Sequence, residues 1–183
     1  MLAPREVFEN PCHYWSFLTG PKDDEVEGPH FDRKEAGKLS PDGTLSGSQV
    51  NNIVENVTEC ISAFANSNKE GGLLVLGIAS NGSVKGVSHL NEQHRNRITD
   101  FDSLLNHQSA SLKFYECQDD EGATNKILLI YVSETKQFIC ERPGRNPKAW
   151  VRNGSQNVPM TQATRDPISQ QKKDRGFRVN LLL

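Results

Sequence analysis

The sequence lacks the features that would place it in a membrane or a secreted class. No run approaches the roughly 18 apolar residues of a membrane span, and no basic segment followed by an apolar stretch opens the chain. The four cysteines lack CxxC spacing, which favours reduced thiols over a metal site or a disulfide framework. We therefore predict a soluble, cytoplasmic protein without membrane contact.

Signals for several enzyme classes are also missing. The chain has no G-x-x-x-x-G-K-[ST] phosphate loop, which argues against an NTPase, and it has no G-x-S-x-G elbow or H-E-x-x-H pair. The Gly71-Gly72 pair lacks dinucleotide-binding spacing, so we expect it to permit close helix–strand packing instead. A formal net charge of −2 gives no global signal for nucleic acid, so any basic surface must be local.

The most regular pattern in the chain is an amphipathic helix over residues 47–65. Apolar residues recur between Val50 and Phe64 at the i, i+3, i+4, i+7 spacing of one helix face. Ser46 and Gln49 have the form of a capping box, in which two side chains satisfy two free backbone donors. We expect the helix to begin after Ser46 and its apolar stripe to pack on a sheet.

Strand and turn signals follow this helix. Residues 73–78 form an unbroken apolar run of strand length, which predicts a central strand that is covered on both faces. Asn81-Gly82 predicts a two-residue type I′ hairpin turn. Residues 88–106 are predicted as a second helix, and residues 112–117 and 126–133 as a second strand pair.

These elements predict the α/β class: one mixed-sheet domain with a long amphipathic helix packed on a central apolar strand. A chain of 183 residues, 35% of them hydrophobic, is long enough for one sizeable core. We assign residues 1–24 to an N-terminal extension, with a short helix or loop at the domain edge. The domain itself covers residues 25–160, and residues 161–183 form a polar tail or linker.

A first candidate site lies at Glu27, Asp32 and Lys34. In an extended segment Asp32 and Lys34 share a face, and a carboxylate two residues from a lysine is an arrangement that metal-dependent nucleases use. Glu27 is an odd number of residues from Asp32 and would face the other side of an unbroken strand, although a bend at Gly28-Pro29 would allow it to join Asp32 in holding a metal ion. The competing interpretation is an edge strand whose charges pair with one another and with solvent.

A second candidate site is the most basic local stretch. Its members are Arg142, Arg145, Lys148, Trp150 and Arg152. Arginines interleaved with an aromatic residue suit phosphate contacts and base stacking. The competing interpretation is a solvated loop with the tryptophan turned into the core.

Three segments, in the same order, resemble the Schlafen-type AlbA_2 family. The central one is ISAFANSNKEGGLLVLGIASNGSVKGV, residues 61–87, flanked by EGPHFDRK at 27–34 and WVRNGS at 150–155. The resemblance covers roughly residues 25–160. It implies a mixed α/β nucleic-acid-binding module and, in some members, a metal-dependent RNase acting on structured RNA such as tRNA.

The sequence departs from the nuclease-active members at one position. Those members carry a third acid just after the central strand, where this chain has Ala79-Ser80-Asn81, and fewer carboxylates weaken binding of a hard cation. We therefore predict a module that binds RNA or DNA within a longer regulatory or defence protein. A Mg²⁺- or Mn²⁺-dependent endoribonuclease with a degenerate acidic site at Glu27 and Asp32 is the first alternative. A protein-interaction domain without nucleic-acid contact is the second, and a homodimer stays open.

Overall fold

The computed structural model describes residues 2–21, 27–40 and 44–180, the last six by their backbone alone. In chain order its elements are α1 (Pro4–Glu9), α2 (Trp15–Leu18), β1 (Phe31–Lys34), α3 (Gly47–Ser67), β2 (Gly72–Leu76), α4 (Glu92–Thr99), α5 (Phe101–Leu104), β3 (Ala110–Gln118), β4 (Thr124–Val132), β5 (Trp150–Asn153), β6 (Gln156–Pro159) and α6 (Gln162–Asn180). Within those described ranges, no helix combines the length and apolar character needed to cross a bilayer.

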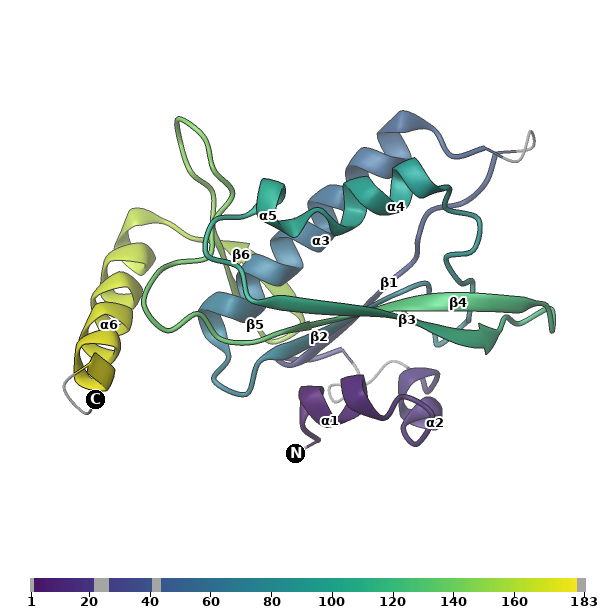
Figure 1. Ribbon diagram of the computed structural model, residues 1–183, viewed down its shortest axis with the longest axis horizontal. Coiled ribbons are helices and arrows are strands. Elements are labelled where there is room, and N and C mark those ends of the chain that lie inside the picture. The colour runs from purple at the N-terminus through teal and green to yellow at the C-terminus, as the bar shows by residue number, and fades with distance from the viewer. Residues whose placement is uncertain (1, 22–26, 41–43, 181–183) are drawn as a thin grey trace.

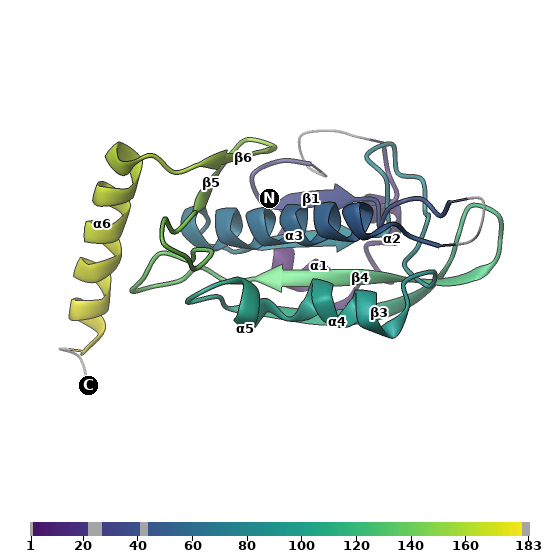
Figure 2. The same cartoon turned by 90° about the horizontal axis from the view of Figure 1, so that it is seen from above.

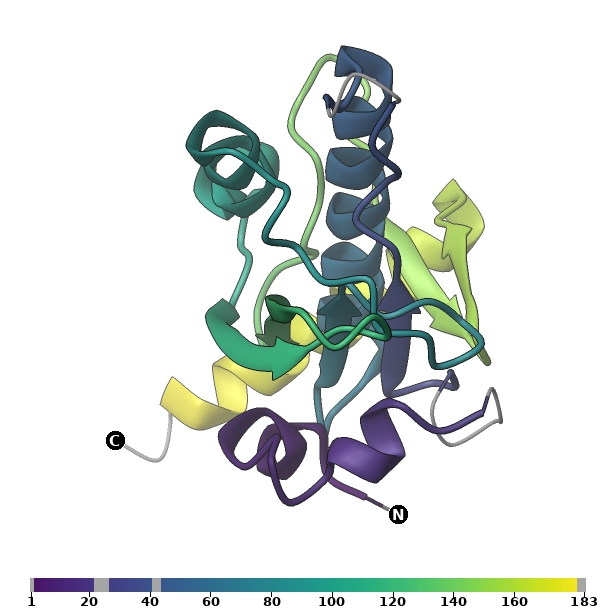
Figure 3. The same cartoon turned by 90° about the vertical axis from the view of Figure 1, so that its right-hand side faces the viewer.

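A four-stranded mixed sheet is the centre of the fold, which confirms the predicted α/β class. Its strand order is β1-β2-β4-β3, with β1 parallel to β2 and the other pairs antiparallel. Figure 1 shows α3 lying across one face of the sheet and α1 and α2 beneath the other. A separate β5–β6 ribbon packs beside α3 (Figure 3), and α6 stands at one end of the molecule (Figure 2).

Helix α3 begins where the capping pattern predicts. The Ser46 hydroxyl accepts from the Gln49 backbone N–H at 3.2 Å, and the Gln49 side chain accepts from the Ser46 N–H at 2.9 Å. The helix runs past Ala65 to Ser67 because the Asn66 side chain donates to the Cys140 and Trp150 carbonyls instead of competing for its own backbone. Tertiary contacts thus decide where the helix ends.

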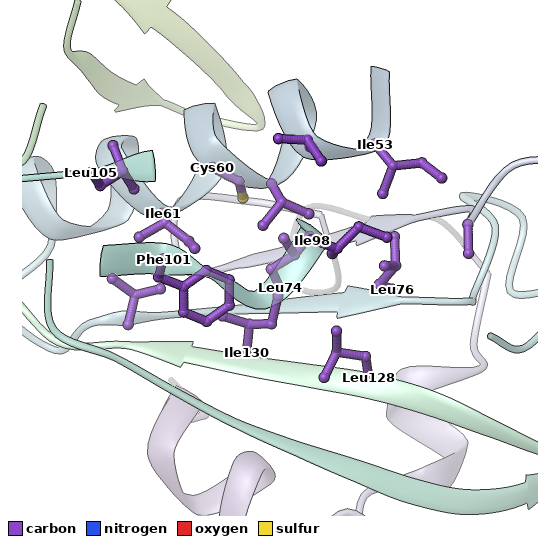
Figure 4. Packing of buried hydrophobic residues seen from close by; sticks show 14 of the residues in the cluster. Ile53, Cys60, Ile61, Leu74, Leu76, Ile98, Phe101, Leu105, Leu128 and Ile130 are labelled. Atoms are coloured by element: carbon purple, nitrogen blue, oxygen red, sulfur yellow. The ribbon is translucent and has the colours of Figure 1, made fainter. Parts of the chain in front are cut away.

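Strand β2 is buried along its whole length, which confirms its predicted central place. Leu74 and Leu76 pack with the apolar stripe of α3 (Figure 4), whereas Leu73 and Val75 pack with the cluster under α1 and α2. Each of these four side chains is at most 1% exposed. Full burial of one such side chain contributes about 1.5–3 kcal/mol, which explains the continuous apolar run.

Glycine permits the close approach of α3 to β2. A Cβ built on Gly72 would lie 2.2 Å from the Phe64 ring, so a larger residue would displace that ring. Gly72 thus confirms the expected close helix–strand packing, whereas a Cβ on Gly71, which has a φ of 78°, would meet the Val132 carbonyl and the Tyr131 ring of β4.

The predicted type I′ hairpin at Asn81-Gly82 is wrong. A type I′ turn needs a positive φ at both central residues, but of Asn81 and Gly82 only Gly82 has one (90°). The Gly82 N–H donates to the Ala79 carbonyl at 2.9 Å, so the turn spans residues 79–82. The Asn81 side chain accepts from the Ser83 N–H at 3.0 Å, which holds the asparagine in an ordinary turn conformation. The returning segment makes a single bridge, Ile78 with Val84.

Three other segments refine the predicted outline. The second strand pair is present as β3 and β4, but the predicted helix over 88–106 is divided at Asp100 into α4 and α5. The N-terminal segment covers a face of the sheet, with Val7 and Leu18 in its core. The segment predicted as a polar tail holds helix α6, whose buried Lys172 donates to the Ala65 carbonyl at 3.2 Å.

Candidate nucleic-acid interface

Strand β1 directs its charged side chains to opposite faces of the sheet. Asp32 turns toward α3, and its carboxylate, only 2% exposed, accepts from Lys34 Nζ at 2.9 Å and from Arg152 Nη1 at 3.0 Å. The buried Cys60 thiol lies 3.6 Å from the same carboxylate. Burial first, and then the Asp32 charge, raise the pKa of this thiol well above its ordinary value, so it donates as a neutral S–H.

Arg152 is the partner that fixes this arrangement. Its guanidinium donates to the Gly28 carbonyl from Nε and Nη2, to the Phe31 carbonyl from Nη2, and to the Asn157 side chain from Nη1, at 2.7–3.0 Å. With the bond to Asp32, these contacts join β5 and β6 to the segment that leads into β1. Arg152 was predicted to contact nucleic acid, but its side chain is 1% exposed and lies inside the domain.

Arg33 forms a second buried cluster on the other face of β1. Its guanidinium donates to the Leu18 carbonyl at 3.1 Å, to the Gly20 carbonyl at 2.7 Å and to the Ser80 carbonyl at 2.6 Å. Its Nε lies 3.5 Å from Glu27 Oε1, and both side chains are at most 5% exposed. The structure therefore places Glu27 with Arg33, on the side of the strand away from Asp32.

Glu27 and Asp32, as placed, do not form one cation site. Each carboxylate is held by a different buried guanidinium on a different face of β1. Among the residues that the structure describes, no group of three or more His, Cys, Asp or Glu side chains is arranged to hold a metal ion. Ala79, at the position of the missing third acid, is 6% exposed. The donor set in this arrangement does not fit Mg²⁺ or Mn²⁺.

The basic loop is closed at its base and exposed at its tip. Arg142 and Lys148 exchange two backbone hydrogen bonds, of 2.7 and 3.2 Å, which define the residues between them as a loop. Arg145 and Lys148 are exposed, and Arg142 forms an exposed ion pair with Glu55 of α3 at 3.2 Å. A hollow of about 150 Å³ is lined by Arg142, Pro143, Asn146 and Lys148.

Glu59 links this loop to the Asp32 cluster. Burial and the neighbouring Glu55 raise its pKa, whereas Lys148, Arg142 and Lys34 act in the opposite direction. These three cations therefore lie close enough to one carboxylate on α3 to interact with it electrostatically. Lys34, which is 35% exposed, therefore lies within electrostatic range of the same carboxylate as Lys148 and Arg142 of the basic loop.

Trp150 was predicted as a stacking residue, and its position requires a different role. It is 6% exposed, and its backbone N–H donates to Ser62 Oγ of α3 at 3.1 Å. Burial of the Trp150 ring stabilises the fold, but a buried ring cannot stack on a base. Of the five residues predicted for this surface, Arg142, Arg145 and Lys148 remain accessible.

Sequence reasoning missed the polar side chains that hold β5 against α3. Ser62, Asn66 and Ser67 bond to backbone groups of the segment from Cys140 to Arg152. Their signal was the S-x-x-x-N-S spacing, which places Ser62 and Asn66 on one helix face beside the apolar stripe. No sequence pattern pointed to Glu59 or Arg33, because only the folded chain brings their interaction partners close to them.

Comparison with known families and structures adds three findings. A family model described as "Schlafen, AlbA_2" matches residues 27–161. The DIP2311 protein from Corynebacterium diphtheriae has a similar fold, with a TM-score of 0.53 and 19% identity over 88% of this chain. The match spans only 31% of that protein. No curated protein matches this chain.

Proposed function

This chain belongs to the Schlafen AlbA_2 family, and on that premise we propose that it binds nucleic acid through the surface formed by the basic loop and Lys34. The single observation that carries the proposal is the loop from Arg142 to Lys148. It has three basic residues and no acidic residue, and it is closed by the bridge at its base. A closed loop presents its cations at lower conformational cost than a free tail does.

The shape of the loop supports phosphate as its ligand. The hollow of about 150 Å³ places Arg142 and Lys148 on the wall of one depression, and charge-assisted hydrogen bonds to phosphate are the strong contacts of such side chains. We include Lys34 of β1 in this surface because Lys34, Arg142 and Lys148 all lower the pKa of the same Glu59 carboxylate. Because the net charge of the whole chain is −2, attraction of a polyanion depends on this local cluster.

The buried ion pairs serve this surface indirectly. Arg152 and Asp32 join β5 to β1, and β5 follows the basic loop directly. The sequence pattern of alternating acid and base on β1 thus acts as a structural support for the loop. Substitution of Arg152 would consequently test folding and not nucleic-acid contact.

The test is equilibrium binding at two salt concentrations. We would measure fluorescence anisotropy of labelled tRNA, duplex DNA and single-stranded DNA at about 50 mM and about 200 mM salt. The Arg145→Ala/Lys148→Ala variant is expected to lower the salt slope by about 1.4–1.8, at about 0.7–0.9 for each phosphate contact. The matched control is Lys85→Ala/Lys126→Ala, which removes two exposed cations beside the β3–β4 turn.

Two outcomes would contradict the proposal. One is the absence of binding at low salt to all three nucleic acids, which would favour the protein-interaction alternative. The other is an equal loss of affinity in the loop variant and in the control variant, because net charge alone would then explain the binding.

Metal-dependent RNA cleavage stays a separate prediction with its own test. We would incubate the protein and its Asp32→Asn variant with tRNA and Mn²⁺, after confirming by circular dichroism that both are folded. Cleavage by the parent protein that is lost in folded Asp32→Asn would support the nuclease alternative. Cleavage that survives the substitution would exclude Asp32 from it.

A further inference from the structure

An exposed aromatic pair lies beside the basic loop and has no part in the core. The rings of His107 and Phe138 stack with centroids 4.6 Å apart and an interplanar angle of 23°. Phe138 is 52% exposed, the largest exposure among the large hydrophobic residues that the structure describes, and His107 is also exposed. With one ring face against His107, this exposure leaves ring surface of Phe138 open to solvent.

The chain holds Phe138 in place from both sides. Before it, the Thr135 N–H and hydroxyl donate to the Ala65 carbonyl at the end of α3, at 3.0 and 3.1 Å. After it, the Cys140 N–H donates to the Asn66 side chain at 2.9 Å. Only the bend at residues 136–138 projects between these two attachments. Phe138 is therefore positioned in advance, which lowers the conformational cost of binding a ligand.

His107 is held by the same part of the fold. Asn106 and Glu141 exchange two backbone hydrogen bonds, of 2.8 and 3.3 Å, next to the histidine. His107 has a φ of 58°, the one positive value found for a residue other than glycine in the described ranges. A positive φ is uncommon for a residue other than glycine, and His107 adopts it directly after the Asn106–Glu141 bridge, with its ring stacked on Phe138.

Basic groups flank the pair. Lys136 is exposed two residues before Phe138, and Arg142 follows four residues after it. Four residues span at most about 14 Å, so a ligand on the ring lies within reach of the basic loop. Figures 1 and 2 show the β4–β5 connection and the end of α5 at the same end of the molecule. The ring thus lies in a segment that carries basic residues, Lys136 and Arg142, and acidic ones, Glu134 and Glu141, the last of them paired with Arg165 at 2.6 Å.

We propose that the His107–Phe138 stack is a platform for an unpaired nucleobase, so that the surface selects single-stranded or looped segments over continuous duplex. This inference rests on the proposed function and adds the structural class of the nucleic acid. An aromatic ring stacks on any base through its π face, and the adjacent cations take the flanking phosphates. In a continuous duplex every base is already stacked and paired, so the platform has no base to accept.

The experiment measures binding of RNA and DNA single strands, and of duplexes of the same sequence, to four variants. Phe138→Ala and Phe138→Leu are expected to weaken single-strand binding by about 5- to 150-fold and to leave duplex binding unchanged. Phe138→Tyr retains the ring and is expected to bind like the parent protein. Phe114→Ala is the control, because Phe114 is also exposed, at 40%, but lies on β3. Comparison of the RNA and DNA strands shows which of the two the platform accepts.

Abasic substitution identifies the stacked base itself. One abasic position in the single strand should weaken binding to the parent protein as much as Phe138→Ala does. The same abasic position should not weaken binding to Phe138→Ala any further. Full affinity of Phe138→Ala, with loss in Arg145→Ala/Lys148→Ala, would overturn the platform and leave the proposed function standing. An equal loss for duplex and single strand, or for Leu and Tyr at position 138, would also overturn it. Absence of all binding would overturn both proposals.

Discussion

Replacing Asp32 by asparagine tests whether the buried carboxylate supports the fold. The substitution keeps the side-chain shape but leaves the Arg152 guanidinium, 1% exposed, without its counter-charge. Removal of one partner from a buried ion pair typically costs about 3–5 kcal/mol, because the remaining charge has already left water. A domain of this size is stable by about 5–15 kcal/mol, so Asp32→Asn should remain folded but lose a large part of its stability.

Urea unfolding, followed by the fluorescence of Trp15 and Trp150, measures this loss. The control is Lys34→Ala, which removes the partly exposed partner of the same carboxylate and should cost about 0–1 kcal/mol. A double-mutant cycle of Asp32→Asn with Arg152→Met isolates the pair. A loss below about 1 kcal/mol, or a coupling energy near zero, would refute the structural role. An increase in stability would indicate that Asp32 is kept for function at the expense of the fold.

Three further predictions concern packing, thiol reactivity and pH. Gly72→Ala should cost about 1–3 kcal/mol in urea unfolding, because the new methyl group meets the Phe64 ring, and unchanged stability would contradict that contact. Exposed Cys12 should react with a thiol reagent in the native protein, whereas Cys140, whose pKa burial raises to about 12, should react only on unfolding; equal rates would contradict this difference. Burial raises the pKa of Glu59, because it disfavours the charged carboxylate. As the pH falls, Glu59 in the folded protein therefore takes up its proton at a higher pH than an ordinary glutamate does. Anisotropy should therefore show RNA binding tightening as the pH falls toward the ordinary pKa of a glutamate, and tightening less in Glu59→Gln; the same pH response in both would exclude Glu59 as its source.

The local elements of this fold are readable from the chain because local contacts produce them. The capping box at Ser46 and Gln49 involves residues three apart, and the stripe from Val50 to Phe64 follows the helical repeat. The unbroken run of β2 reflects burial on both faces, which any sheet covered by helices imposes. These features need no knowledge of distant partners.

Only part of the candidate site could be predicted from the sequence, because its buried residues contact partners that are distant in the chain. The accessible cations of the loop follow from its prolines and charges, which exclude a central strand and favour solvent. The partners of Asp32 did not follow, since Arg152 lies 120 residues away in the sequence. Likewise, the stack of His107 on Phe138 joins two loops that have no shared sequence pattern.

Sequence by itself determined the capped helix α3, the buried strand β2 and the strand pair β3–β4, and it showed which residues carry charge. Tertiary structure decided which charges are buried: it placed Glu27 and Asp32 on opposite faces of β1 and took Arg152 into the interior. The physical reason is that burial of a charged side chain is unfavourable unless a counter-charge and hydrogen-bond partners compensate for the loss of water. Those partners come from strands and loops far apart in the chain, so only the assembled fold selects them.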